Sequence, residues 1–182
     1  MKVIKEGQLQ FTFKERWRAS QFDRWSFYRK QFQKIGRVEN VCGKCNARSN
    51  QGIKAIDILA IQPGSCCWCI EIKDYRQNAR TKSIDLADEV AIKIRDSLAA
   101  IFAAAARANE PAEKSMAQDS IACPRIRIVL HLEQPATPSS LFPRAIDPAK
   151  VRQRMKQLLK SIDPHPLVVD TSSANMVPWS VR

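Results

Sequence analysis

Two short apolar segments with carboxylates inside them constrain this chain most. AIDILAI spans residues 55–61 and CWCIEIK spans residues 67–73. Between them lies QPGS, whose adjacent Pro and Gly are typical of a turn. The segments therefore predict two antiparallel strands joined by a short turn. Asp57 lies within the first strand, where an ionised carboxylate costs several kcal/mol unless a partner compensates it.

The second strand is expected to present a polar face to Asp57. Side chains alternate along a strand, so Cys69, Glu71 and Lys73 share one face, and the apolar residues between them form the other. A hairpin turn brings Asp57 beside Glu71, and two adjacent carboxylates repel each other unless they share a cation. Mg²⁺ or Mn²⁺ would satisfy both, with Lys73 orienting or deprotonating a water. The pattern predicts metal-assisted phosphodiester hydrolysis; a cross-strand ion pair between Glu71 and Lys73 is the alternative.

The remaining elements predict an α/β fold. Apolar residues at spacings of three and four indicate helices, and continuous apolar runs indicate strands. The expected order is a helix over 14–35, strands over 37–42, 54–61 and 67–73, a helix from Ser83 to near Asn109, a mobile loop over 110–123, a strand over 125–132, a helix capped by Asp147, and a strand over 166–170. The strand after the long helix can lie parallel to its neighbour through a right-handed crossover. We expect a mixed central sheet flanked by helices, in one domain over residues 1–182.

The charge distribution favours a polyanionic partner. Thirty Lys and Arg against eighteen Asp and Glu give a net charge of +12. Residues 1–52 carry twelve basic and four acidic side chains, residues 71–133 carry ten of each, and residues 144–160 carry six and one. Nucleic acid suits such basic segments, because its dense phosphates release counterions when Lys and Arg replace them. Trp17 and Trp25 stand among basic residues and could stack on bases, although their surroundings also fit a helix core.

The chain is expected to be cytoplasmic, without a membrane partner. Its longest uncharged apolar run, Leu98–Ala106, is far below the ~20 residues that span a bilayer. The first ten residues lack the apolar core of a secretory signal.

The two carboxylate-bearing strands carry a family resemblance. Asp57, thirteen intervening residues and then Glu71-Ile72-Lys73 resemble the motif of the PD-(D/E)xK nuclease superfamily, which has the restriction-endonuclease-like fold. The resemblance covers roughly residues 14–132, as an α-β-β-β-α-β core to which residues 133–182 add a helix and a strand. It implies a Mg²⁺-dependent endonuclease that cleaves DNA, with Asp57 and Glu71 as metal ligands and Lys73 near the attacking water.

The same resemblance suggests auxiliary residues and a dimer. An acidic residue of the first helix often joins such sites, which makes Glu15 a candidate with Asp23 behind it. Arg76 or Gln77, just after the motif, could contact the scissile phosphate. Nucleases that cut both strands often form homodimers. An inactive nucleic-acid-binding module of the same fold is the alternative.

The cysteines offer a second metal hypothesis. Cys42 and Cys45, then Cys66 and Cys69, show the C-x₂-C spacing of a structural zinc site, as in a zinc-ribbon interaction protein. The predicted turns that hold the two pairs lie at opposite ends of the strand over 54–61, which is about 8 × 3.3 Å long. One tetrahedral ion would not reach both pairs unless the intervening loop folded back. Zinc is therefore the disfavoured alternative.

Overall fold

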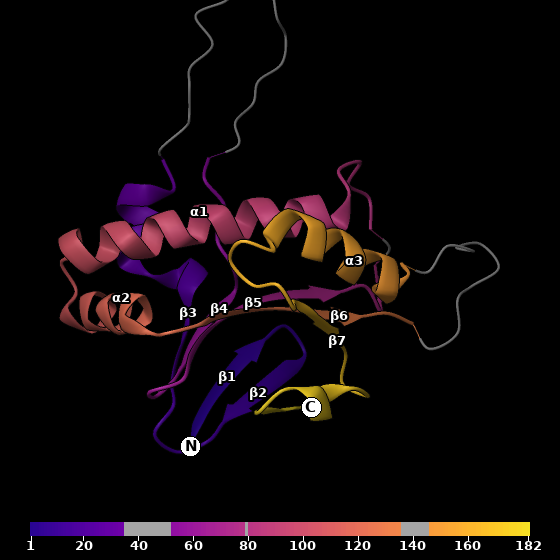
Figure 1. The fold of residues 1–182 in the computed structure, drawn as a ribbon, viewed down its shortest axis with the longest axis horizontal. Coiled ribbons are helices and arrows are strands. Elements are labelled where there is room, and N and C mark those ends of the chain that lie inside the picture. Colours follow the sequence, from indigo (N-terminus) through magenta and orange to yellow (C-terminus); the bar gives the residue numbers. More distant parts are fainter. Residues whose placement is uncertain (35–51, 79, 136–145) are drawn as a thin grey trace, which may run out of the picture.

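A five-stranded sheet forms the centre of the molecule (Figure 1). The computed structural model describes residues 1–34, 52–78, 80–135 and 146–182. The strand order is β3-β4-β5-β6-β7, in which β3, β4 and β5 run antiparallel while β6 and β7 lie parallel to β5. The strands are β3 (Arg18–Gln21), β4 (Ile58–Gln62), β5 (Cys66–Asp74), β6 (Ile126–Glu133) and β7 (Leu167–Val169). The prediction of a mixed α/β sheet flanked by helices is confirmed.

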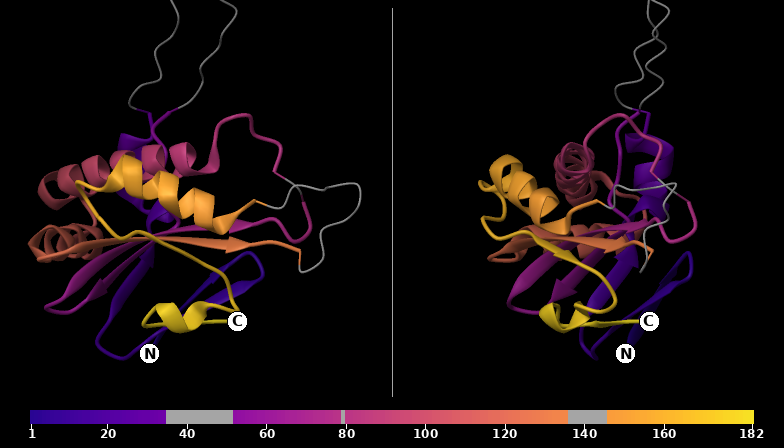
Figure 2. Two further views of the ribbon diagram at one scale, coloured as in Figure 1. Left: turned by 45° about the vertical axis from the view of Figure 1, so that its right-hand side comes forward. Right: turned by 90° about the vertical axis from the view of Figure 1, so that its right-hand side faces the viewer.

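Three helices cover one face of this sheet (Figures 1 and 2). They are α1 (Leu86–Arg107), α2 (Pro111–Ala122) and α3 (Pro148–Leu159). Helices α1 and α2 connect β5 to β6, and α3 connects β6 to β7, so α1 and α3 both begin at the edge where the parallel strands end. Asp85 caps α1 by accepting a hydrogen bond from the Ala87 amide, and Asp147 caps α3 in the same way from Ala149. Within the described ranges, no helix combines the length and apolarity needed to cross a bilayer.

A second, smaller sheet covers the opposite face (Figure 2). This hairpin sheet consists of β1 (Lys2–Glu6), β2 (Leu9–Phe13) and β8 (Ser180–Val181), in the order β1-β2-β8. A tight turn with Gly7 at φ +56° joins β1 to β2. Phe11 and Phe13 of β2 are fully buried against the central sheet, where they share a cluster with Trp68 and Ile70. This hairpin was not among the elements expected from the sequence.

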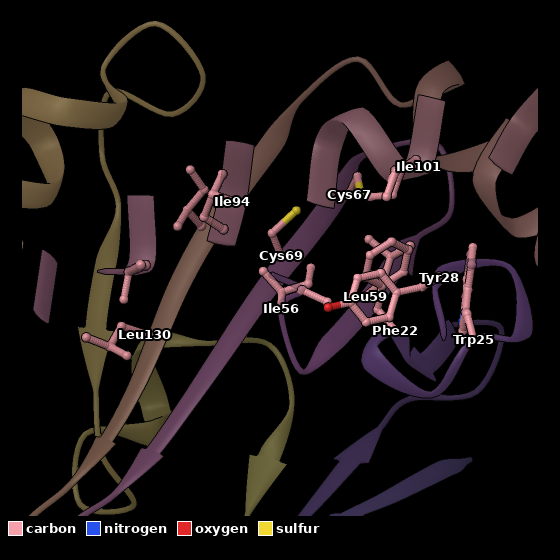
Figure 3. Close-up of a cluster of buried hydrophobic side chains, with 14 of the residues drawn as sticks. Phe22, Trp25, Tyr28, Ile56, Leu59, Cys67, Cys69, Ile94, Ile101 and Leu130 are labelled. Atoms are coloured by element: carbon pink, nitrogen blue, oxygen red, sulfur yellow. The ribbon is translucent and has the colours of Figure 1, made fainter. Parts of the chain in front are cut away.

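The face toward the helices holds the larger core (Figure 3). Cys67 and Cys69 of β5 point toward α1, whose Ile94 and Ile101 lie opposite them. Leu59 of β4 joins the same cluster. The alternation predicted for residues 67–73 is confirmed, because Cys69 lies on the helix face while Trp68 and Ile70 lie on the hairpin face.

The prediction of one helix over 14–35 is wrong. Residues Arg18–Gln21 form β3, and the helical turns that follow are short: η1 (Phe22–Arg24) and the π-helical η2 (Tyr28–Phe32). Pairing with β4 along the whole of β3 outweighs the local preference of this polar segment for a helix. The strand expected over 37–42 falls outside the described residues. In the described chain the first strand of the central sheet therefore precedes the helical turns, which reverses the expected order.

The prediction of a loop over 110–123 is also wrong, because α2 occupies most of that range. Pro111 stands in the first turn, where its missing amide costs nothing, and Met116, Ala117 and Ser120 are buried on the inner face. Because α2 contains so few apolar residues, its sequence shows only a weak helical periodicity of hydrophobic positions. Helix α1 begins after Asp85, two residues beyond the expected Ser83, whereas the strand over 125–132 and the helix capped by Asp147 are confirmed. A short turn, η3 (Ala174–Met176), precedes β8.

Candidate functional site at the carboxyl edge of the sheet

The start of β4 and the end of β5 bring Asp57 and Glu71 together. Ile58 lies opposite Ile70 in the register of the two strands, which puts Asp57, directly before β4, across from Glu71. The Asp57 amide donates to the Ile70 carbonyl at 3.2 Å, and its Oδ2 accepts from the Ile72 amide at 2.6 Å. These bonds hold the Asp57 carboxylate at the carboxyl end of β5, on the side of the helices.

Glu71 lies at the centre of a network of ion pairs. Its side chain is completely buried, and its Oε1 lies 2.8 Å from Nζ of Lys73 and 2.6 Å from Nζ of Lys93. Lys93 belongs to α1 and also lies 3.6 Å from Oδ1 of Asp57. One lysine that the sequence analysis did not identify therefore links both predicted carboxylates. Oε2 of Glu71 accepts no hydrogen bond from the part of the chain that the structure describes.

The surroundings of Glu71 favour its neutral form. Burial and then the nearby charge of Asp57 raise the pKa of Glu71, and the attraction of Lys93 and Lys73 only partly offsets them, so that the pKa reaches about 7. Glu71 therefore changes its charge near neutral pH, in contact with two ammonium groups.

A second buried glutamate adjoins this network from α1. Glu89 pairs with Lys73 at 3.2 Å, Arg80 at 3.1 Å and Lys82 at 2.5 Å. Burial alone would raise the pKa of Glu89, but the hydrogen bonds and charges of Lys82 and Lys73 outweigh it and lower the pKa to about 2. Burial also opposes the charged form of Lys73, yet Glu71 and Glu89 raise the pKa of Lys73 above its usual value. Asp57, Glu71, Lys73, Glu89 and Lys93 are called the Glu71 cluster below.

The auxiliary residues lie in different places. Glu15 is exposed in the turn between β2 and β3, close to Arg18. Arg18 pairs with Ile61, at the end of β4 that lies farthest from Asp57, so Glu15 is remote from the cluster.

Asp23 lies closer to the cluster, because the amide of the preceding Phe22 donates to the Asp57 carbonyl at 2.9 Å. Burial and then the charge of Asp57 raise the pKa of Asp23. Arg76 is exposed and pairs with Asp74 at 2.6 Å.

Gln77 is likewise exposed, in the segment that follows β5. Thus neither Gln77 nor Arg76 contacts the cluster, and of the two acidic candidates Asp23 is the better placed.

The cysteines do not form the four-ligand zinc site. Cys66 belongs to the core on the hairpin face of the central sheet, whereas Cys69 points toward the helices (Figure 3). Side chains on opposite faces of one sheet cannot ligate the same tetrahedral ion. Cys42 and Cys45 lie outside the described residues. Within the described ranges, no group of three or more His, Cys, Asp and Glu side chains is arranged to hold a metal.

A basic helix face lies beside the Glu71 cluster. Helices α3 and α1 pack together and begin at the same edge of the sheet (Figure 2). Arg154 of α3 reaches Asp88 in the first turn of α1 at 3.1 Å. Three further cations on α3 and one at its C-cap are exposed and have no carboxylate within 4 Å among the described residues; these, the α3 basic face, are Lys150, Arg152, Lys156 and Lys160. The edge therefore combines buried charges with an exposed cationic surface suited to a polyanion.

Comparison with known proteins changes the functional interpretation. No protein-family model and no solved structure matches the chain. A cysteine–tRNA ligase from Neisseria meningitidis serogroup A is 32% identical to it over 210 aligned residues, which cover 100% of this chain and 30% of that ligase. The chain thus spans about 30% of the length of the relative it matches. That relative is an enzyme of the tRNA ligase class, so the prediction of a Mg²⁺-dependent endonuclease that hydrolyses DNA is wrong, and the nuclease and hydrolase classes are withdrawn with it.

Proposed function

We propose that this chain binds tRNA, as an RNA-binding part of a protein related to cysteine–tRNA ligase. The similarity to that ligase along the entire chain is the observation that carries the proposal. Because the chain corresponds to only 30% of the ligase, the proposal concerns RNA binding and not the ligation of cysteine.

The cationic edge of the sheet supports RNA as the ligand. The α3 basic face supplies four exposed cations, and Lys82, about half exposed, extends the positive charge beyond the Glu71 cluster. Lys and Arg side chains bind phosphates in any nucleotide sequence, which gives affinity that falls steeply as salt rises. The nucleic-acid partner expected from the net charge is therefore retained, with tRNA in place of DNA.

We further propose that the scaffold of this RNA-binding part resembles the PD-(D/E)xK superfamily in its chain topology. Strands β3, β4 and β5 form an antiparallel meander, and α1 leads to a parallel β6. This β-β-β-α-β order of the described elements, without the first helix of the expected α-β-β-β-α-β core, supports a restriction-endonuclease-like scaffold. The resemblance concerns fold alone, since the same fold can carry unrelated functions.

Asp57 and Glu71 would hold one Mg²⁺ in the RNA complex. The donor set fits this ion, because Mg²⁺ commonly uses one or two carboxylates together with phosphate oxygens. Oε2 of Glu71 is buried without a hydrogen bond from the described residues, and Asp57 Oδ1 faces the same cluster. When bound, the ion would be held by Asp57 and Glu71 and would supply positive charge for an RNA phosphate. Without it, Lys73 and Lys93 neutralise them.

Binding of the full chain to tRNA tests the proposed function. Fluorescence anisotropy would compare a labelled cysteine tRNA transcript with a DNA duplex of similar charge, over a range of salt concentrations. We expect the transcript to bind more tightly than the duplex at every salt concentration, with affinity falling as salt rises. Equal affinity for both probes would reduce the interaction to non-specific charge attraction and overturn the proposal.

The double variant Arg152→Glu/Lys156→Glu locates the interface. It reverses two charges on the α3 basic face, and we expect the affinity for tRNA to fall by more than about tenfold. The control is Arg107→Glu/Arg125→Glu, which makes the same change of charge at exposed positions at the C-terminus of α1 and the start of β6. Equal losses in the two variants would show that net charge, and not the α3 basic face, determines binding.

Electron paramagnetic resonance of bound Mn²⁺ tests the metal proposal separately. We expect one ion per chain in the presence of tRNA, lost in Asp57→Asn and retained in Glu110→Gln, an exposed control position. If the wild-type complex binds no Mn²⁺, the Mg²⁺ proposal fails while tRNA binding can still stand.

A further inference from the structure

The central sheet has an open edge that forms a groove. Among the described strands, β3 pairs only with β4, and β1 is the outermost strand of the hairpin sheet. Between these two strands and the first turn of α2 lies a groove of about 690 Å³, called the edge groove. Lys2, Lys5, Trp17, Arg18, Arg24 and Glu113 are among the residues that line it.

The edge groove carries a net positive charge, because four cations and one carboxylate, that of Glu113, line it. Both carboxylate oxygens of Glu113 are already engaged, accepting hydrogen bonds from the backbone amides of Ser26 and Phe27 at 2.6 and 3.0 Å. Arg18 pairs with Asp119. Lys2, Lys5 and Arg24 are exposed and have no carboxylate within 4 Å in the described ranges. Three cations in one groove therefore remain available to an anionic ligand.

One wall of the groove presents an aromatic ring in a fixed position. Trp17 is half-buried, and its ring stacks on Phe13 with the centroids 5.9 Å apart. Trp179 contacts the same ring edge-on at 6.3 Å. These contacts hold the indole while part of it stays accessible from the groove. An ordered ring among cations is the combination that single-stranded nucleic acids use, through base stacking and phosphate contacts.

The groove is less suited to an added peptide strand. An extended peptide would have to pair with the free backbone edge of β3. Gln21 of β3 crosses toward β1, where its Nε2 donates to the Lys5 carbonyl at 3.0 Å and to Glu6 Oε2 at 2.8 Å. This bridge closes the gap between β3 and β1 to a further strand at that point. A ligand that lies over the groove and contacts side chains meets no such obstacle.

We propose that the edge groove binds a single-stranded stretch of RNA, with phosphates on Lys2, Lys5 and Arg24 and a base stacked on Trp17. The proposal rests on the proposed function for the source of the RNA, since tRNA has unpaired loops and an unpaired 3′ end. The groove is a separate site from the α3 basic face, because its lining comes from β1, β3, η1 and α2.

The test measures how the full chain binds a fluorescent oligouridine of about 12 nucleotides. We expect Lys2→Ala/Lys5→Ala to weaken binding about tenfold and to reduce the salt dependence by about two phosphate contacts. Arg107→Ala/Arg125→Ala, at exposed positions at the C-terminus of α1 and next to β6, is the matched control and should bind oligouridine as the wild type does. If the groove variant binds like the wild type, or if the control loses as much affinity as the groove variant, the edge groove is excluded, while tRNA binding on the α3 basic face is untouched.

Crosslinking identifies the stacking residue without relying on a variant that has to fold. Irradiation of the wild-type complex with 4-thiouridine-containing RNA should label the peptide that contains Trp17, and Trp17→Ala should weaken oligouridine binding about tenfold. Labelling confined to other peptides would overturn the proposal. So would tighter binding of polyglutamate than of oligouridine, which would identify an acidic polypeptide as the ligand. If neither oligouridine nor tRNA binds, the proposed function fails as well.

Discussion

The two faces of strand β5 show how differently one segment can be stabilised. On the hairpin face, Trp68 and Ile70 pack among apolar and aromatic side chains. On the helix face, Glu71 and Lys73 form ion pairs with residues of α1. Apolar burial stabilises a fold directly, whereas buried ion pairs roughly balance attraction against lost hydration. The hairpin face and the Cys67–Cys69 part of the helix face therefore contribute stability, whereas the charged end of the helix face is better explained by binding.

The largest predicted effect is on the hairpin face. Trp68 is buried, meets Trp179 edge-on at 5.1 Å and lies below Arg127 at 5.5 Å. We expect Trp68→Ala to lower the free energy of unfolding by about 3–5 kcal/mol, because it leaves a large cavity. Urea unfolding measures the loss, with Val3→Ala at an exposed position as the control that should change by less than about 0.5 kcal/mol. A loss below that of the control would remove the distinction between the faces.

On the charged face, substitution of Glu71 should raise the free energy of unfolding, in contrast to the loss expected for Trp68→Ala. Its pKa is raised to about 7, so between pH 4.5 and 7 an unfolded chain ionises this group while the folded chain keeps the proton. Wild-type stability therefore falls as pH rises through this window. Glu71→Gln keeps the neutral form, and we expect it to be more stable by up to about 3 kcal/mol at pH 8 and equal to the wild type at pH 4. Metal-free urea unfolding at both pH values checks this, and a destabilised variant at pH 8 would contradict it.

Glu89, in the same network, should behave inversely. Its pKa is lowered to about 2, so its ionised form stabilises the fold above pH 4.5, and this contribution is lost as pH falls toward 2. We expect Glu89→Gln to lower the free energy of unfolding by about 2 kcal/mol at pH 7, with a smaller difference near pH 3. Thermal unfolding of Glu89→Gln and Glu71→Gln side by side at pH 7 gives the comparison. Shifts of the same sign would show that the two glutamates share one environment.

The smallest effect concerns the one imidazole on the hairpin face of the described strands. His131 of β6 is buried against Phe11, and its Nε2 lies 2.9 Å from Glu133 Oε1. Burial lowers the pKa of His131 more than Glu133 raises it. Below about pH 6.5 the unfolded chain therefore binds a proton at this position more readily than the folded chain does. The free energy of unfolding consequently decreases as the pH decreases. His131→Gln should flatten this part of the profile, as measured by urea midpoints from pH 7 to 5; a parallel profile would contradict it.

The sequence was sufficient for the centre of the fold and for three of the five residues of the Glu71 cluster. Residues 67–73 combine an apolar period of two with charges on one face, and the short turn after residues 55–61 limits the register, so Asp57 and Glu71 could be paired. Lys93 and Glu89 could not be assigned to the cluster from the sequence, because charges four residues apart on a long helix normally indicate a solvated face. Only the crossover that places α1 over β5 turns them toward Glu71.

The N-terminal third shows the opposite case. Leu9, Phe11 and Phe13 alternate after Gly7, which is a signal for a hairpin that the sequence analysis did not use. The spacing of Trp25 and Phe32 does reflect burial, but in short helical turns. The preceding β3 is held by its partner β4 and has too little alternation of apolar residues to be predicted from its own sequence.

The function was missed for a different reason. A pattern of carboxylates and lysine specifies a charged site without specifying the reaction.

The pairing of β8 with β2 determines where this polypeptide can be joined to others. Residue 182 exchanges two backbone hydrogen bonds with Gln10, so the last strand lies on one side of β2 and the first strand on the other. Lys2 lies opposite Phe13 and Arg182 lies opposite Gln10, so two strand spacings and about three residues along the strand separate the extremities, a distance of roughly 14 Å. Strands β1 and β8 both run antiparallel to β2, so they are parallel to each other. Polypeptide joined before Lys2 and after Arg182 would therefore leave the hairpin sheet at opposite ends of its strands, and this unit would act as a spacer between the two joined segments.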